Sequence, residues 1–116
     1  LGLLCQGTTV IRNAQRLRLK ESDRIAAMEA ELRACGGVVE SQGGTITIQG
    51  CAQQLRAPEA PLQGHNDHRV VMSLAVLAAA AGLPLTVEDA QAVKKSWPGF
   101  FAAIKPLGVE VNEYVG

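Results

Sequence analysis

Apolar residues recur along the chain with two different periods, and these periods predict where helices and strands lie. Over residues 23–35 the apolar positions follow helical spacing, with Ser22 as the expected N-cap and a pair of glycines after the last turn. Nearly every residue of 67–81 is apolar, which predicts a helix that is buried on most sides. A third helix is expected over about 97–105, where a proline suits the first turn.

Short runs of β-branched or alternating residues predict strands between these helices. The pair Gly43-Gly44 is typical of a two-residue hairpin turn, because glycine adopts positive φ without steric cost. The predicted strands cover residues 8–19, 38–42, 45–49, 85–87 and a last segment with Val109, Val111 and Tyr114. Residues 50–64, which contain several glycines and prolines, are expected to form a loop. The resulting order β, α, β, β, α, β, α, β indicates an α/β fold.

The composition narrows the classes of protein to which this sequence can belong. With 116 residues, of which 47% are hydrophobic, the chain can form one domain with a core. Eleven basic residues balance eleven acidic ones, so we expect no nucleic-acid partner. No apolar run reaches the roughly 18 residues of a membrane span, so we expect no membrane association. Three widely spaced cysteines without a C-x-x-C pair favour reduced thiols in the cytoplasm.

A first candidate site is the charged run at the start of the helix over 23–35. Lys20, Glu21, Asp23 and Arg24 lie within five residues at a helix N-terminus, where unpaired backbone N–H groups suit an anionic ligand. Glu21 is the acid of this run that could move a proton. Nearby cations would lower its pKa and burial would raise it, and the sequence leaves that balance open. The alternative is a capped helix with solvated charges.

A second candidate site precedes the nearly all-apolar helix. A charged arginine at the head of a buried helix needs a partner, so Arg69 is expected to pair with Asp67 or with a bound anion. His65 and His68 flank Asp67, but the sequence has no other histidine and no nearby cysteine, so we predict no metal site. The alternative is a helix cap in which Asn66 or Asp67 accepts backbone N–H bonds.

The third candidate site contains two lysines, Lys94 and Lys95, just before Trp97 and another helix start. Paired lysines are more commonly a solvated surface, and a lone tryptophan usually packs in a core. Together, however, the three sites place cations at three helix N-termini. Arginine binds carboxylate or phosphate through two parallel hydrogen bonds and lysine adds a point charge, so the pattern favours anionic ligands.

The three candidate sites belong to longer blocks of sequence. The blocks are Leu19-Lys20-Glu21-Ser22-Asp23-Arg24-Ile25, Asn66-Asp67-His68-Arg69 with Met72, and Lys95-Ser96-Trp97-Pro98 with Phe101. In order and spacing they closely resemble the EPSP synthase (3-phosphoshikimate 1-carboxyvinyltransferase) family. The resemblance implies an inside-out α/β barrel of βαβαββ units, with helices packed inside and sheets outside. UDP-N-acetylglucosamine enolpyruvyl transferases share this fold, but the first two blocks look like the shikimate enzyme.

The resemblance implies a transfer reaction that needs no metal or organic cofactor. In this family the enolpyruvyl group of phosphoenolpyruvate passes to the 5-hydroxyl of shikimate 3-phosphate and phosphate leaves, a step of aromatic amino-acid biosynthesis. Carried over to this chain, Arg24 and Arg69 would clamp the carboxylate of phosphoenolpyruvate, and Lys95 would contact its phosphate. Lys20 would contact shikimate 3-phosphate, and Glu21 would transfer a proton near the reacting carbon. Glu21 and Lys20 are thus the expected catalytic residues.

Family members are much longer than this chain and have two similar domains. The resemblance therefore implies that residues 1–116 are a partial C-terminal domain, inactive alone, whose apolar surface would favour self-association. Alternatives are another enolpyruvyl transferase of the UDP-N-acetylglucosamine type and a non-catalytic anion-binding α/β module. A further alternative is a small α/β domain whose charged helix caps are only structural.

Overall fold

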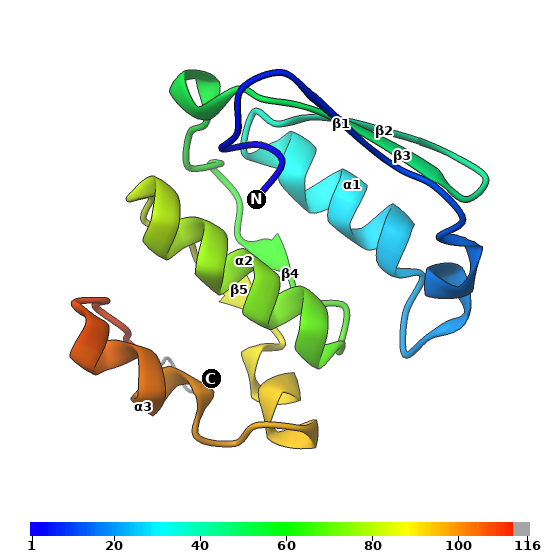
Figure 1. Cartoon of the computed structure of the whole chain (residues 1–116). Helices are drawn as coiled ribbons and strands as arrows, with labels where there is room; N and C mark the ends of the chain where they lie inside the picture. The colour runs from blue at the N-terminus through cyan, green and yellow to red at the C-terminus, as the bar shows by residue number, and fades with distance from the viewer. Residues whose placement is uncertain (113–116) are drawn as a thin grey trace.

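The computed structural model of this chain describes residues 1–112, in which helices alternate with strands (Figure 1). The strands are β1 (Thr8–Ile11), β2 (Val38–Gln42), β3 (Thr45–Gln49), β4 (Leu62–Gln63) and β5 (Val87–Glu88). The α-helices are α1 (Arg24–Ala34), α2 (His68–Ala81) and α3 (Phe100–Ile104). Short 3₁₀ segments join them: η1 (Gln15–Leu19), η2 (Ala52–Gln54), η3 (Ala90–Lys95) and η4 (Lys105–Leu107). Within the described range, none of these helices combines the length and apolar character needed to cross a membrane.

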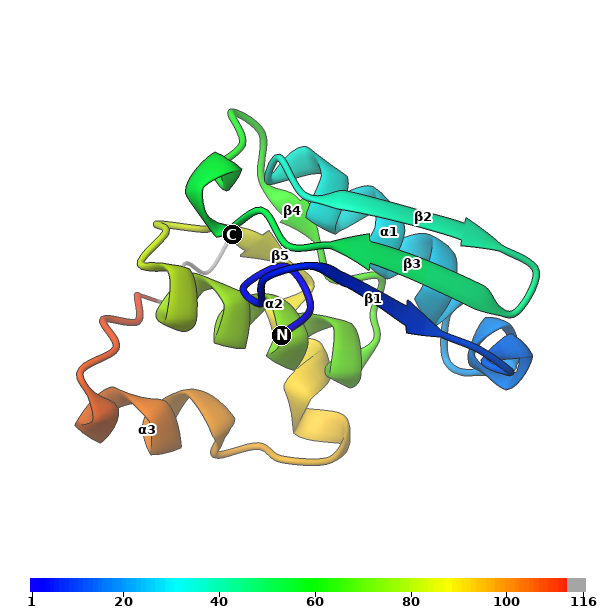
Figure 2. The same ribbon diagram turned by 45° about the horizontal axis from the view of Figure 1, so that its top comes forward.

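The first half of the chain folds into an antiparallel sheet with α1 behind it (Figure 2). β3 lies between β1 and β2 in this sheet. The hairpin of β2 and β3 closes at Gly43-Gly44, where Gln42 pairs with Thr45. Gly43 adopts φ +59°, the left-handed value that such a turn requires, so the predicted hairpin is confirmed. β4 and β5 form a separate parallel pair.

Both long helices begin at an aspartate that serves as the N-cap. Asp23 Oδ1 accepts the backbone N–H of Ala26 at 3.0 Å, and Asp67 Oδ1 accepts that of Arg69 at 3.0 Å. The predicted helices over 23–35 and 67–81 are confirmed. The predicted cap Ser22 is wrong by one position, because its hydroxyl donates to Asp67 at 2.7 Å instead of capping α1.

The buried apolar side chains of the described residues form three clusters, and α2 contributes to two of them. The first cluster packs α1 against α2 and β4, the second packs α2 against η3 and α3, and the third lies beneath the sheet. Their members are Ala27, Cys35, Leu62, Val70, Leu74 and Leu77; Val71, Ala92, Val93 and Phe100; and Leu3, Val39 and Cys51. Helix α2 therefore lies between α1 and α3 (Figure 1).

Helix α2 is less buried than its sequence predicts. Leu74 and its inward neighbours are buried, but Arg69, Ser73 and Val76 face outward, and Val76 is 51% exposed. This outer face borders an apolar hollow of about 330 Å³ between α1, α2, the sheet and residues 1–4. The prediction of burial on most sides is wrong, because no described segment of the chain covers this face.

The strand predicted over residues 8–19 ends at Ile11, so the prediction is wrong for residues 12–19. Asn13 adopts φ +60° and turns the chain out of the sheet into the 3₁₀ segment η1. Arg18 then donates from Nε to the carbonyl oxygen of Gly43 at 3.0 Å, which ties η1 to the hairpin turn. The alternation of leucine and basic residues therefore reflects a compact turn and not a strand.

The later elements are shorter than predicted or lie elsewhere. Helix α3 begins at Phe100 and not at 97, because Pro98 and Gly99 form a turn before it. The predicted loop over 50–64 contains η2 and β4, and the predicted strand over 85–87 is found as β5, the parallel partner of β4. Strands of two residues carry no periodic signal in a sequence.

The last predicted strand is not found in the part of it that the structure describes. Val109 and Val111 lie in no regular element. Gly108 adopts φ +90° directly before them and redirects the chain after η4. Tyr114, the remaining member of the predicted strand, lies outside the described residues.

Candidate functional site

The charged run at the start of α1 is held in place by Arg18 of η1. Besides its bond to the hairpin turn, Arg18 donates from Nη1 to the carboxylate of Asp23 at 3.0 Å. The pKa of Asp23 lies below its usual range, because the carboxylate accepts the N–H of Ala26 and the hydrogen bond of Arg18. The run that contains Lys20 and Glu21 is therefore anchored at both the hairpin and the helix N-terminus.

Arg24, the first residue of α1, joins two of the predicted sites, although 43 residues separate it from Asp67. Its Nε donates to Asp67 Oδ2 at 2.9 Å and its Nη2 to Asp67 Oδ1 at 3.3 Å. Nη2 also forms an ion pair with Glu21. The Arg24 side chain is only 12% exposed, and the hydrogen bond to Asp67 is the main cause that raises its pKa. A permanently charged guanidinium thus lies at the junction of α1 and α2.

Asp67 is the buried acceptor at the centre of this junction, with 0% of its surface exposed. Besides Arg24, it accepts hydrogen bonds from the hydroxyl of Ser22 at 2.7 Å and from the backbone N–H of Arg69 at 3.0 Å. Burial by itself would raise the pKa of Asp67, but the hydrogen bonds from these three residues outweigh it and lower the pKa to about 2. Asp67 is therefore ionised at neutral pH.

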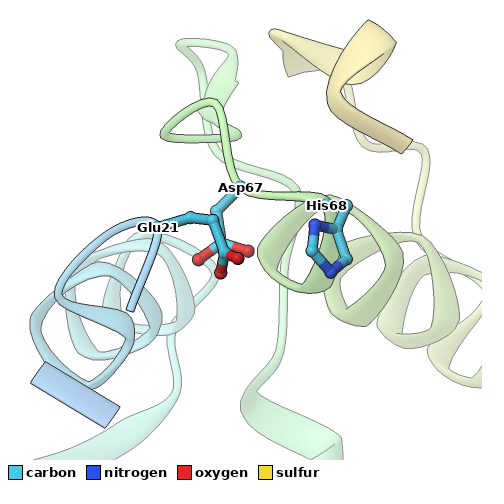
Figure 3. Close-up of side chains that lie close together, drawn as sticks. All are labelled: Glu21, Asp67 and His68. Carbon is cyan, nitrogen blue, oxygen red and sulfur yellow. The ribbon is translucent and has the colours of Figure 1, made fainter. Parts of the chain in front are cut away.

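Glu21 lies at the surface of the junction, and its carboxylate points toward that of Asp67 (Figure 3). Its side chain is 45% exposed. The pKa of Glu21 is lowered, first by a hydrogen bond from its own backbone N–H and then by the positive charge of Arg24, against the opposing effects of burial and of Asp67. The sequence leaves this balance open. In the structure the lowering effects outweigh the raising ones, which favours the ionised form of the Glu21 carboxylate.

The chain reaches Asp67 through a sharply bent turn. His65 and Asn66 adopt φ +55° and φ +51°, a left-handed conformation that is uncommon for residues other than glycine. Before them, Gly64 is buried so tightly that an added Cβ would lie 2.5 Å from the carbonyl oxygen of Glu88 in β5. This turn leads directly out of β4 and brings the Asp67 carboxylate against α1.

The third predicted site reaches the same turn through Lys95. Its Nζ donates to the carbonyl oxygen of Asn66 at 2.6 Å, across 29 residues of sequence. Lys95 ends η3, which packs against α2. The neighbouring Lys94 is exposed and forms no hydrogen bond with the residues that the structure describes. Trp97 is 50% exposed and meets the ring of Phe100 edge-on, so the expected core packing of Trp97 is only partial.

Lys20 and Arg69 stay exposed at the edge of the junction. Neither side chain forms an ion pair with a residue between 1 and 112. Of the two partners expected for the Arg69 side chain, Asp67 is wrong, because Arg24 occupies the Asp67 carboxylate and Arg69 donates only its backbone N–H. A bound anion stays a prediction. Both arginines line the apolar hollow beside α2. The Arg69 guanidinium is therefore a cation that an anionic ligand can reach.

The two histidines lie in different surroundings. Glu21, Asp67 and His68 offer ligand atoms that all lie within 4.8 Å of one another (Figure 3). Because Arg24 already donates to both carboxylates, a metal ion here would meet its positive charge. His65 instead contacts a carboxylate of α1 at 3.0 Å. A shared metal between the two histidines thus has no support in this geometry.

Glu31 is a supporting residue that the sequence reasoning missed. It is 8% exposed, accepts the backbone N–H of Gln63 at 2.7 Å and contacts His65 Nε2 at 3.0 Å. Its spacing from Met28 and Cys35 places it on the apolar face of α1, and a glutamate on such a face was the signal that could have revealed it. Glu31 fixes the strand and the turn that lead to Asp67.

Similarity to known proteins extends over nearly the whole chain. The family model of EPSP synthase (3-phosphoshikimate 1-carboxyvinyltransferase) matches residues 1–104. The 3-phosphoshikimate 1-carboxyvinyltransferase of Methanocella arvoryzae is 41% identical over 112 residues, which cover 97% of this chain and 26% of that protein. The enzyme of the same name from Clostridium kluyveri is 39% identical over 114 residues, which cover 98% of this chain and 26% of that protein.

The fold agrees with the sequence similarity. The EPSP synthase of Acinetobacter baumannii matches with a TM-score of 0.79 and 27% identity, over 90% of this chain and 24% of that one. The expected α/β fold of the enolpyruvyl transferase type is therefore confirmed. The chain spans about a quarter of the length of these relatives. On these matches, the chain belongs to the EPSP synthase family.

Proposed function

We propose that this chain forms one wall of an active site that transfers the enolpyruvyl group of phosphoenolpyruvate to the 5-hydroxyl of shikimate 3-phosphate. Phosphate leaves in this reaction, and neither a metal nor an organic cofactor takes part. Residues 1–116 would be part of the C-terminal domain, and the rest of the enzyme would supply the remaining wall. Membership of the EPSP synthase family supports this proposal.

One observation carries the proposal. The Arg24 guanidinium meets Asp67 across 43 residues, and Lys95 reaches the carbonyl of Asn66, next to Asp67, across another 29. Three charged segments that are distant in sequence therefore converge on one junction. A purely structural set of helix caps has no need for such convergence, because each cap bonds to its own helix. Converging cations instead suit a substrate with several negative charges.

Phosphoenolpyruvate fits this arrangement as a ligand with a carboxylate and a phosphate. Arg24 and Arg69 line the same hollow and would bind the carboxylate through guanidinium N–H donors. Lys95, which contacts the turn just before α2, would bind the phosphate by exchanging the Asn66 carbonyl for a phosphate oxygen. Fixing both ends of the substrate would hold its double bond in place for attack.

Glu21 would transfer the proton, and Lys20 would bind the second substrate. A carboxylate of phosphoenolpyruvate that approaches Arg24 competes with Glu21 for the guanidinium. Once released from that ion pair, Glu21 has a higher pKa and can hold the proton that the enol carbon receives. Lys20, exposed just before it, would contact the phosphate of shikimate 3-phosphate. The hydroxyl oxygen then bonds to the neighbouring carbon and loses its proton. One proton of the new methyl group returns to Glu21 as the C–O bond to phosphate breaks, which restores the double bond, and the hydroxyl proton leaves with the phosphate.

The cellular compartment and the association state of the chain follow from the same proposal. The three cysteines are free thiols in the structure, which suits a reducing cytoplasm. The apolar hollow beside α2 would be covered by the remainder of the enzyme, or by a second copy of the chain when the chain is alone. We therefore propose a cytoplasmic enzyme, and an isolated chain that is inactive and self-associates.

The test is turnover by the full natural gene product, whose intact mass is measured first. Phosphate release from phosphoenolpyruvate should require shikimate 3-phosphate. Lys95→Ala should lower kcat/KM by about 100-fold or more, because a cation is lost from the site of developing charge. The matched control Lys94→Ala, an exposed neighbour, should stay within about threefold of wild type. Equal losses in both variants would contradict the role of Lys95.

Other outcomes would identify the alternatives. Turnover with UDP-N-acetylglucosamine and none with shikimate 3-phosphate would indicate the related transferase. Binding of phosphoenolpyruvate without turnover, in a natural product of about this mass, would indicate an anion-binding module. Product formation by the 116-residue chain alone would refute the expectation that it is inactive.

A further inference from the structure

The contacts of Arg24 leave one edge of its guanidinium open to a ligand. Nε and Nη2 face Asp67 at 2.9 and 3.3 Å, and Nη2 also meets Glu21. The two hydrogens of Nη1 have no hydrogen-bond partner among the described residues. Since the side chain is only 12% exposed, the guanidinium has little freedom to turn another edge outward. The group that binds the Nε–Nη2 edge therefore fixes the direction in which Nη1 points.

Asp67 holds that edge, and it is itself fixed from other directions. The Ser22 hydroxyl donates to its Oδ2 at 2.7 Å, and the backbone N–H of Arg69 donates to its Oδ1 at 3.0 Å. The carboxylate is fully buried and follows the left-handed turn at Asn66. A buried, fully bonded carboxylate needs no rearrangement when a ligand arrives, which is the condition for preorganisation.

The same carboxylate also links the two arginines. Asp67 is the N-cap of α2, and Arg69 is the second residue of that helix. One side chain therefore sets both the orientation of the Arg24 guanidinium and the start of the helix that carries Arg69. No other acidic residue in the described range makes hydrogen bonds to both segments.

We propose that Asp67 is a positioning residue, which directs the Nη1 edge of Arg24 toward the carboxylate of phosphoenolpyruvate and holds Arg69 at a fixed distance from it. This inference rests on the proposed function. Asp67 is buried behind Arg24 and acts through it, so it binds no substrate itself. Loss of the Asp67 carboxylate should therefore weaken the binding of phosphoenolpyruvate and leave the binding of shikimate 3-phosphate nearly unaffected.

The test is Asp67→Asn in the full natural gene product. Asparagine keeps the size of the side chain but removes its charge, and it places an amide N–H₂ against neighbouring donors. The KM for phosphoenolpyruvate should rise by about 10- to 100-fold, while that for shikimate 3-phosphate stays within about threefold. Ser22→Ala removes one hydrogen bond to Asp67 and leaves the Asp67 carboxylate charged. This variant should raise the KM for phosphoenolpyruvate by a smaller factor.

A double-mutant cycle separates positioning from a general structural role. If Asp67 acts mainly through Arg24, then Asp67→Asn should add a clearly smaller loss to an Arg24→Lys enzyme than to wild type, and the remainder reflects its hold on Arg69. Additive losses, or equal rises in both KM values, would overturn the inference and leave the proposed function standing. If Asp67→Asn does not fold by circular dichroism, Ser22→Ala and its combination with Arg24→Lys give the same comparison. A wild-type protein without turnover would overturn the proposed function and this inference together.

Discussion

The buried carboxylate of Asp67 should make the stability of the fold fall at acid pH. Its pKa in the folded chain is about 2, below the ordinary value of 3.8. A carboxyl with a depressed folded pKa contributes stability that is fully present above the unfolded pKa and is lost as the pH falls through the folded one. The contribution of Asp67 is therefore present from about pH 5 upward and disappears between about pH 4 and pH 2.

The magnitude follows from the same two values. Each pH unit between the folded and unfolded pKa corresponds to about 1.4 kcal/mol, so the interval from 3.8 to about 2 gives about 2.5 kcal/mol. This is a large part of the stability of a domain of this size. Because the Asp67 side chain is fully buried, little of this contribution is screened by solvent.

Urea unfolding of the chain, followed by circular dichroism at several pH values between 7 and 2, measures this effect. The free energy of unfolding of wild type should fall by about 2.5 kcal/mol more than that of Asp67→Asn, which cannot titrate at this position. The carboxyl of Asp23 titrates in both proteins and its contribution cancels in the difference. Because Asp67 affects the pKa of Glu21, the two proteins are compared in a Glu21→Gln background. Asp89→Asn, at an exposed aspartate, controls for the loss of one negative charge. Identical pH dependence in wild type and Asp67→Asn would refute the reasoning.

Further predictions concern packing. Leu74→Ala should lower the free energy of unfolding by about 3 kcal/mol in urea titrations, because the side chain is fully buried, whereas Val76→Ala on the outer face should cost less than about 1 kcal/mol. Gly64→Ala should lower the melting temperature, since its Cβ would lie 2.5 Å from a carbonyl oxygen. Gly99→Ala should not, since its Cβ would meet only Trp97 Nε1 at an ordinary 3.8 Å. Sedimentation of the isolated chain should show association that rises with concentration and weakens in Val76→Lys, and a monomer at every concentration would contradict this.

Local signals in the sequence were sufficient for the elements that depend on nearby residues. The hairpin follows from Gly43-Gly44 and the alternation around it, α1 follows from apolar residues at helical spacing, and α2 follows from its nearly continuous apolar run. Where a distant contact decided the conformation, the prediction failed. Ser22 has the chemistry of an N-cap, but its hydroxyl donates to Asp67, which is 45 residues away. The strand predicted over 8–19 failed beyond Ile11 because Asn13 turns the chain and the bond from Arg18 to the hairpin turn holds η1.

The candidate site was predicted in its parts, and its internal connections were not. The sequence indicated three clusters of cations, and the family resemblance implied that Arg24, Arg69 and Lys95 bind an anionic substrate. It offered Asp67 as one of two partners for Arg69 and did not link Asp67 to Arg24, because a helix cap and a side-chain partner have the same local sequence. Only the packing of α1 against α2 decides which guanidinium reaches the buried carboxylate. The functional roles of these residues stay predictions until turnover is measured.

The distance in sequence between Arg24 and Asp67 also determines when the junction forms during folding. Closing a loop of 43 residues has an entropic cost that the local hairpin and the helix caps avoid, so the hairpin and α1 can form first. A partly folded chain with α1 in place would still carry Arg24 with an undirected guanidinium. During refolding followed by pulsed deuterium exchange, the Nε–H of Arg24 should therefore become protected later than the capping N–H of Ala26.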